Sequence, residues 1–162
     1  MTYKEGRFWQ PDVTVATIVE RDGRFLMVEE TSQGRLVMNQ PAGHLEPYES
    51  LASAALRETL EETGWTVELQ AFLGAYQWTA PSVDEGGSGK QYLRFAFIAT
   101  PVTHDATLPL DTGIEQALWL SREEIVALDA AGRLRSPLVL QVLEDFWKGR
   151  SCPLDTLVQL QP

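Results

Sequence analysis

Apolar residues in this chain occur in short runs separated by polar turns, and many of the runs alternate with the two-residue period of a β-strand. Asp22-Gly23 separates the first two runs and is typical of a tight β-hairpin turn. The predicted strands span residues 13–19, 24–28, 67–78 (as one strand or two), 91–99 and 117–120. Residues 81–89 are rich in glycine and too short for a regular element, so we expect a mobile loop there.

Three other segments carry helix signals. Residues 50–63 lead into Gly64, which is typical of a helix C-terminus, and Ser121 with Glu124 forms a capping box before a short helix at 125–128. Ser136-Pro137 opens a third helix that Gly149 closes. Because strands and helices are intermixed with hairpins, the pattern predicts a single α/β domain over residues 1–162, with a mixed sheet covered by helices on both faces.

The helix at 50–63 is predicted to carry a carboxylate face and a core face. Glu58, Glu61 and Glu62 stand at i, i+3 and i+4, so they project from one side. Such close like charges repel, so the cluster requires full solvation or a cation among them, and a divalent metal ion meets that need. The predicted core face comprises Ala52, Leu56, Thr59, Leu60 and Thr63. The mostly small residues expected beside the carboxylates, where they leave room for a ligand, are Leu51, Ala54 and Ala55.

Length and composition narrow the class of protein. The chain has 162 residues, 44% of them hydrophobic, which is enough for one core. A net charge of −10 argues against binding a nucleic acid polymer, although bound divalent cations would let an acidic protein hold a small phosphorylated molecule. Cys152 is the single cysteine, so we expect no internal disulfide and a cytoplasmic location. We also expect no secretory leader in the first ten residues and no membrane span.

The spacing around the acidic helix resembles a known motif. Gly43, Glu49, Arg57-Glu58, Glu61-Glu62 and Gly64, followed by apolar Trp65, are similar to the Nudix box of the Nudix hydrolases. Thr59 departs from it, because the family usually has a large aliphatic residue there. Shorter runs at residues 39–46, 77–78, 80–81, 93–95 and 134–139 resemble the NudJ-type phosphatases within that family.

The resemblance implies an α/β/α sandwich and a site for Mg²⁺, with Mn²⁺ as a substitute. Its metal ligands are then Glu58, Glu61, Glu62 and the carbonyl of Gly43. Gly43 also marks a point where the backbone is expected to turn or to approach a ligand. Arg57 is implied to pair with Glu49, which requires a curled entry turn before the helix. The general base is implied to lie in the box, with Glu61 as first choice, or on a distant loop, where Glu115 is the candidate, either as base or as an extra metal ligand.

Residues outside the box are candidates for binding the substrate. Arginine matches the geometry of phosphate oxygens, so the candidate phosphate donors are Arg35, Lys90, Arg94 and Arg135, each of which has an ordinary surface charge as its alternative. Trp78 is expected either to stack on a heterocycle or to fill the core. His44 follows the glycine of the box and either approaches the phosphates or is an ordinary loop residue.

The expected activity is attack of water on phosphorus in a diphosphate linked to an organic group. The resemblance implies nucleoside tri- and diphosphates and thiamin-type pyrophosphates as substrates, with release of phosphate. A nucleoside triphosphate pyrophosphatase with the same site is an alternative, and a Nudix-fold nucleotide sensor without catalysis is another. The sensor is disfavoured because all three box carboxylates are present. The chain is expected to be a monomer or a homodimer.

Overall fold

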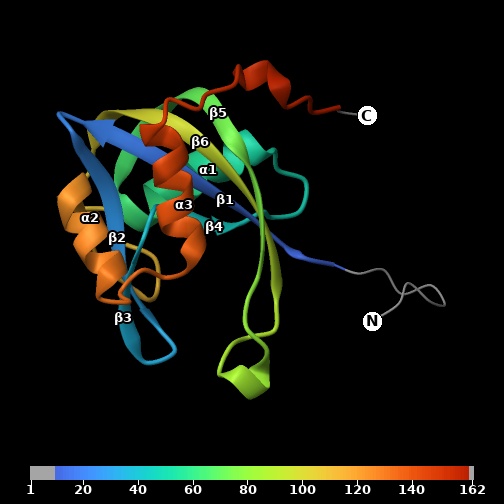
Figure 1. Ribbon diagram of the computed structural model, residues 1–162. Coiled ribbons are helices and arrows are strands. Elements are labelled where there is room, and N and C mark those ends of the chain that lie inside the picture. The colour runs from blue at the N-terminus through green and yellow to red at the C-terminus, as the bar shows by residue number, and fades with distance from the viewer. Residues whose placement is uncertain (1–9, 161–162) are drawn as a thin grey trace.

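A computed structural model describes residues 10–160, so the opening residues on which the expected lack of a leader rests lie outside it. The chain forms a mixed seven-stranded sheet in the order β3-β2-β1-β6-β5, with β4 on β1 and β7 on β2 (Figure 1). The strands are β1 (Asp12–Arg21), β2 (Arg24–Ser32), β3 (Arg35–Asn39), β4 (Ala42–His44), β5 (Trp65–Thr79), β6 (Gln91–His104) and β7 (Ile114–Ser121). The pairing of β1 with β6 is parallel, and the other pairings are antiparallel.

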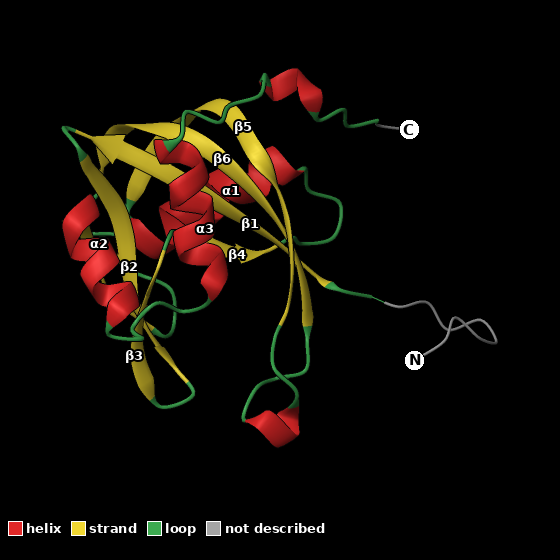
Figure 2. Cartoon of the chain, in the orientation of Figure 1, coloured by secondary structure: helices red, strands yellow, loops and turns green. Residues whose placement is uncertain are grey.

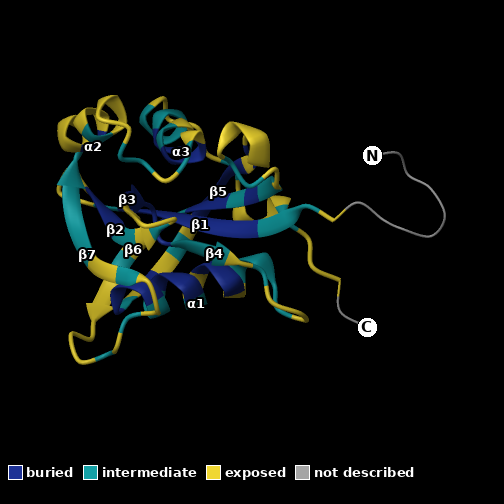
Figure 3. Cartoon of the chain, turned by 90° about the horizontal axis from the view of Figure 1, so that it is seen from below, coloured by how far each residue is buried: buried dark blue, intermediate teal, exposed yellow. Residues whose placement is uncertain are grey.

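The helices cover both faces of the sheet, as predicted (Figure 3). They are α1 (Leu51–Thr63), α2 (Arg122–Ala130) and α3 (Pro137–Trp147). On one face Val15 of β1 packs with Ala54 and Ala55 of α1, and on the other Ile18 packs with apolar residues of α2 and α3. Side chains alternate along a strand, so β1 supplies both cores, and the fold is the expected α/β/α sandwich.

Local signals in the sequence hold in the structure. Asp22 and Gly23 have positive φ values of 53° and 76° and join β1 to β2, as an Asp-Gly hairpin turn requires. Ser50 caps α1 and Gly64 ends it in the left-handed conformation, while Ser121 and Glu124 form the predicted capping box of α2. Residues 67–78 belong to one strand, β5, which is interrupted by register shifts rather than by a turn.

Several expectations are wrong. The short strands β3 and β4 were not predicted, and the loop expected at 81–89 contains a 3₁₀ turn at Val83–Glu85, at the tip of the β5–β6 hairpin arm (Figure 2). The core face predicted for α1 is correct only in part, because Thr59 and Thr63 are buried but Leu56 is 39% exposed, and Ala54 and Ala55 are buried as well. These alanines therefore pack the core and leave no room for a ligand. No helix in the described part of the chain is long and apolar enough to span a membrane.

Candidate active site

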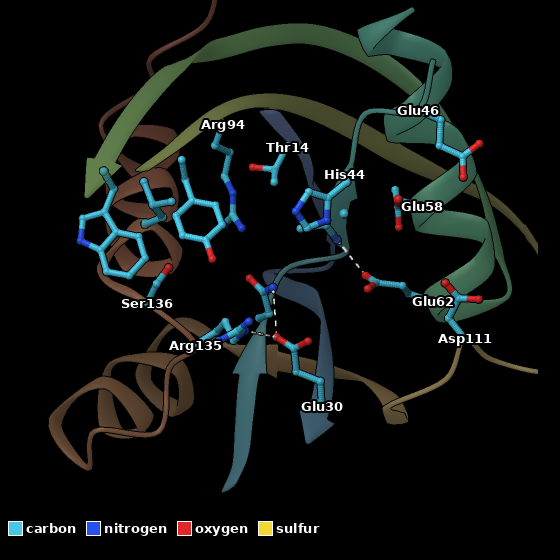
Figure 4. Close-up of a pocket in the computed structure, with 16 residues that line it drawn as sticks. Thr14, Glu30, His44, Glu46, Glu58, Glu62, Arg94, Asp111, Arg135 and Ser136 are labelled. Carbon is cyan, nitrogen blue, oxygen red and sulfur yellow. Dashed lines mark hydrogen bonds and ion pairs between the residues drawn. The ribbon is translucent and has the colours of Figure 1, made fainter. Parts of the chain in front are cut away.

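A cavity of about 350 Å³ opens between α1, the ends of β1, β4 and β6, and the start of α3 (Figure 4). Carboxylates of α1 and the β6–β7 loop line one end. The other end is lined by Trp78, Tyr92 and Arg94 of the β5–β6 hairpin together with Arg135. The cavity thus joins an acidic end to an aromatic and basic end.

Three carboxylates converge at the acidic end. Glu58, Glu61 and Asp111 each offer an oxygen, and these oxygens lie within 4.8 Å of one another. Asp111 is held there because its backbone N–H donates to the carbonyl of Glu61 at 3.1 Å. Clustered carboxylate oxygens are the ligands that Mg²⁺ prefers, so the geometry fits a hard divalent cation. Glu62 lies apart from this group, and its Oε2 accepts the backbone N–H of Ala42 at 2.8 Å.

Gly43 makes room for one of these acids. A Cβ on Gly43 would lie 2.0 Å from Cδ of Glu58, much closer than any real contact. Gly43 lies within β4 and is paired with Val15, so the turn that was one of the two expectations for this position is absent. The glycine is required because the Glu58 carboxylate rests against its Cα.

The acidic end holds carboxyl groups with raised pKa values. Burial raises the pKa of Glu58, with further contributions from the charges of Glu61 and Asp111, while Arg57 acts in the opposite direction. Burial raises the pKa of Glu62 to about 8, despite its hydrogen bond from Ala42. Raised values mean that negative charge here is unfavourable without a compensating cation.

Arg57 joins the entry turn to the acidic cluster. Its Nη2 and Nε donate to the two oxygens of Glu49 at 2.6 and 3.1 Å, which is the pairing implied by the motif. Its Nη1 donates to Glu58 at 2.8 Å and to Glu61 at 3.1 Å. Glu49 also accepts the backbone N–H of Glu46 at 2.7 Å, so the curled entry turn exists. These partners raise the pKa of Arg57 far above its usual range.

The opposite end combines aromatic rings with buried polar groups. Trp78 stacks on Tyr92 with ring centroids 5.6 Å apart, so it is neither fully in the core nor isolated. Arg94 is 6% exposed, and burial lowers its pKa to about 10. Buried side-chain atoms without a hydrogen-bond partner among the described residues include Oγ1 of Thr14, Oδ1 of Asn39 and Nε of Arg94. All three residues line the cavity.

Only some of the remaining predicted site residues line this cavity. His44 and Arg135 line the cavity, and Arg135 pairs with Glu30 at 3.1 Å. Arg35 lines a neighbouring cleft and donates to the carbonyl of Gly132, while Lys90 pairs with Asp12 at 2.8 Å. Glu115 is exposed, accepts a hydrogen bond from Thr31 and is not among the three converging carboxylates.

Sequence reasoning missed Asp111, Thr14 and Asn39. Asp111 lies in the loop before β7, four residues ahead of Glu115, which belongs to β7, and the role predicted for Glu115 stays a prediction. Thr14 looks like one more β-branched strand residue, and only its strand pairing brings it to the cavity. Asn39 lies in the run 39–46 that carried part of the resemblance, although no role was assigned to it.

Comparison with known proteins agrees with this geometry. A family model described as the NUDIX domain matches residues 9–141. Phosphatase NudJ of Escherichia coli (strain K12) is 41% identical over 149 residues, 92% of each chain. A solved NUDIX hydrolase from Nitrosomonas europaea is 44% identical with a TM-score of 0.86, covering 93% of this chain and 98% of that one. The E. coli ORF135 protein, 24% identical with a TM-score of 0.64 over 87% of this chain and 91% of that one, shares the fold. The chain belongs to the Nudix hydrolase family.

Proposed function

We propose that this Nudix hydrolase is a Mg²⁺-dependent phosphatase that hydrolyses the phosphoric anhydride of small pyrophosphorylated compounds, with Mn²⁺ as a substitute cation. The observation that carries the proposal is the convergence of Glu58, Glu61 and Asp111 at one end of a cavity whose other end has an aromatic stack. Glu62 and the carbonyl of Gly43 line or border the same end and complete the proposed ligand set.

The chain's own residues have distinct proposed roles. A divalent cation bound by the carboxylates supplies charge neutralisation and a more acidic water when present. Glu61, whose side chain is 41% exposed, is the proposed base that takes a proton from water, with Glu115 as the more distant candidate. Arg57 and Glu49 hold the entry turn against α1 and so keep Glu58 and Glu61 in position.

The proposed substrates are nucleoside tri- and diphosphates and thiamin-type pyrophosphates, and the proposed product is inorganic phosphate. Trp78 and Tyr92 offer a stacking surface for a heterocycle, and Arg94 offers a donor for phosphate. Arg35 is a proposed donor only for a part of the substrate that extends into the neighbouring cleft. The similarity to phosphatase NudJ supports phosphate release over the release of pyrophosphate.

The test is a panel of these compounds, assayed with and without Mg²⁺ in ¹⁸O-labelled water. We expect Mg²⁺-dependent turnover with the label in inorganic phosphate. Release of pyrophosphate from triphosphates would instead identify a nucleoside triphosphate pyrophosphatase. Binding without turnover in Mg²⁺ or Mn²⁺ would identify a nucleotide sensor and contradict the proposal.

The cytoplasm is the proposed location, since Cys152 is a free thiol in the structure. Small phosphorylated molecules are the proposed partners rather than nucleic acid or membrane. The net charge of −10 supports this choice, because polymer binding requires basic surfaces. Gel filtration would distinguish a monomer from a homodimer.

A further inference from the structure

Arg94 is a buried arginine that lacks an acidic partner. It is 6% exposed, and no carboxylate of the described residues lies within ion-pair distance of it. The one hydrogen bond of its guanidinium within the described chain is from Nη1 to Oε1 of Gln40, at 3.4 Å. The side chain of Gln40 is held in place by a second hydrogen bond, because its amide Nε2 donates to the carbonyl of Val139 at 2.6 Å. Most N–H donors of Arg94 are therefore unused while the residue lines the cavity.

Strand pairing places two further polar groups beside this guanidinium. Thr14 of β1 is in register with Arg94 of the parallel strand β6 and with His44 of the antiparallel strand β4. Neighbouring strands are about 4.8 Å apart, so the three side chains form a row across the cavity. Figure 4 shows this row running from Arg94 through Thr14 to His44, on the side that leads to Glu58 and Glu62. Thr14 is 4% exposed and its hydroxyl has no partner among the described residues.

The nearby acids do not satisfy this arginine. Glu30 lines the same cavity, but Arg135 binds its carboxylate at 3.1 Å and the Asn39 amide donates to it at 3.3 Å. Glu62 is held by the backbone of Ala42 on the far side of the row. An unpaired buried guanidinium is costly, and an anion with several oxygens is the ligand that matches its planar set of donors.

We propose that Arg94 and Thr14 bind the phosphate that stays on the organic group after hydrolysis, and that they do so without a metal ion. The inference rests on the proposed function and adds the direction in which the substrate lies. The organic group stacks at Trp78 and Tyr92, its own phosphate lies on Arg94 and Thr14, and the terminal phosphate reaches the acidic end. For a diphosphate, water attacks the terminal phosphorus and Glu61 takes its proton. The bond from that phosphorus to the bridging oxygen breaks, inorganic phosphate forms at the acidic end, and the organic monophosphate, which keeps the bridging oxygen, leaves from the Arg94 end.

Calorimetric titration of the full chain in EDTA tests this assignment. The probes are AMP, CMP and thiamin monophosphate, each compared with the same compound lacking phosphate. We expect at least one monophosphate to bind more tightly than its dephosphorylated form by about 10-fold or more. Arg94→Met should remove about 10- to 100-fold of that affinity, and Thr14→Val about 2- to 10-fold, because the first loses a charged donor and the second a neutral one.

Control variants separate binding from folding and from metal chemistry. Glu61→Gln should keep the affinity for monophosphate in EDTA, because Glu61 belongs to the acidic cluster. Arg94→Met should keep or raise the melting temperature, since the arginine has no ion pair to lose. If Arg94→Met does not fold, Arg94→Lys and Thr14→Val are compared with wild type instead. Thr14→Ser retains the hydroxyl that Thr14→Val loses and should therefore bind the monophosphate about as tightly as wild type.

Three results would overturn the assignment: no monophosphate binding in EDTA, equal affinity of wild type and Arg94→Met, or equal affinity for a monophosphate and its dephosphorylated form. A large fall in the melting temperature of Arg94→Met with unchanged monophosphate binding would make Arg94 a structural residue. These outcomes are independent of the hydrolysis panel, in which wild-type protein without Mg²⁺-dependent turnover would reject the proposed function itself.

Discussion

Arg57 and Arg94 lie near opposite ends of one cavity, and their surroundings differ. Arg57 donates to three carboxylates and one backbone carbonyl, whereas Arg94 is more deeply buried and makes a single long hydrogen bond to Gln40. An arginine with all its donors used stabilises the loop and helix that it joins. An arginine with unused donors beside a cavity is free to bind a ligand.

The two ends of the cavity are expected to have different functions. Changes at the acidic end, with Glu58, Glu61 and Asp111, should reduce kcat, because the reaction occurs there. Changes at the aromatic and basic end, with Trp78 and Arg94, should act mainly through KM, because that end binds the part of the substrate that does not react.

The largest expected effect is that of Glu61→Gln. We expect kcat to fall by about 10²- to 10⁴-fold, because the amide is a poor base and a poor metal ligand. The melting temperature should change little, since the side chain is 41% exposed. Steady-state kinetics with Mg²⁺ and thermal unfolding measure the two quantities.

Glu115→Gln is the matched control for that variant, because Glu115 is an exposed acid outside the converging carboxylates. We expect its kcat to stay within about threefold of wild type. A near-normal rate for Glu61→Gln combined with a large loss for Glu115→Gln would transfer the role of base to the distant loop.

Gly43→Ala should reduce kcat by about 10- to 100-fold. The added methyl group would overlap the Glu58 carboxylate and displace it from Glu61 and Asp111. Gly23→Ala is the control for stability alone, because its positive φ strains an alanine while its Cβ meets no neighbour within 4 Å. If both variants lose stability but kcat falls only for Gly43→Ala, the close contact is required for catalysis.

Trp78→Ala should raise KM by about 10-fold and change kcat little, because it removes one ring of the stack with Tyr92. Trp78→Phe retains an aromatic face and should recover most of the affinity. A fall in kcat without a change in KM would show that the two ends do not divide binding from reaction in this way.

The last expected effect, small for any one pH unit, is on pH-dependent stability in EDTA. The pKa of Glu62 is raised to about 8 in the folded protein, so the folded state keeps a proton that the unfolded state releases near its ordinary value of 4.5. Stability should therefore fall as pH rises from about 4.5 to 8, by about 1 kcal/mol per pH unit or a few degrees in the melting temperature. Glu62→Gln should flatten this slope in thermal melts, and an unchanged slope would assign it to other groups.

Local signals account for the elements that were predicted correctly. The Asp22-Gly23 turn and the Ser121–Glu124 capping box depend on backbone preferences and hydrogen bonds within a few residues. The strands β3 and β4 were missed because they are short and owe their form to partners elsewhere in the sheet. The core face of α1 was predicted correctly for Thr59 and Thr63 but not for Leu56, and the burial of Glu58 and Glu62 was missed because glutamate is usually exposed.

The amino-acid sequence by itself determined the acidic helix and a mixed sheet between helices, because these follow from residue spacing and hydrophobic period, and the resemblance of one motif to the Nudix box indicated the family. Only the tertiary structure decided that Asp111 joins Glu58 and Glu61 while Glu62 binds the backbone of Ala42. It also decided that Thr14 of β1 lies opposite Arg94 of β6, which is 80 residues further along the chain. Strand register between distant segments depends on how both faces of the sheet bury their side chains, and no local pattern in the chain contains that information.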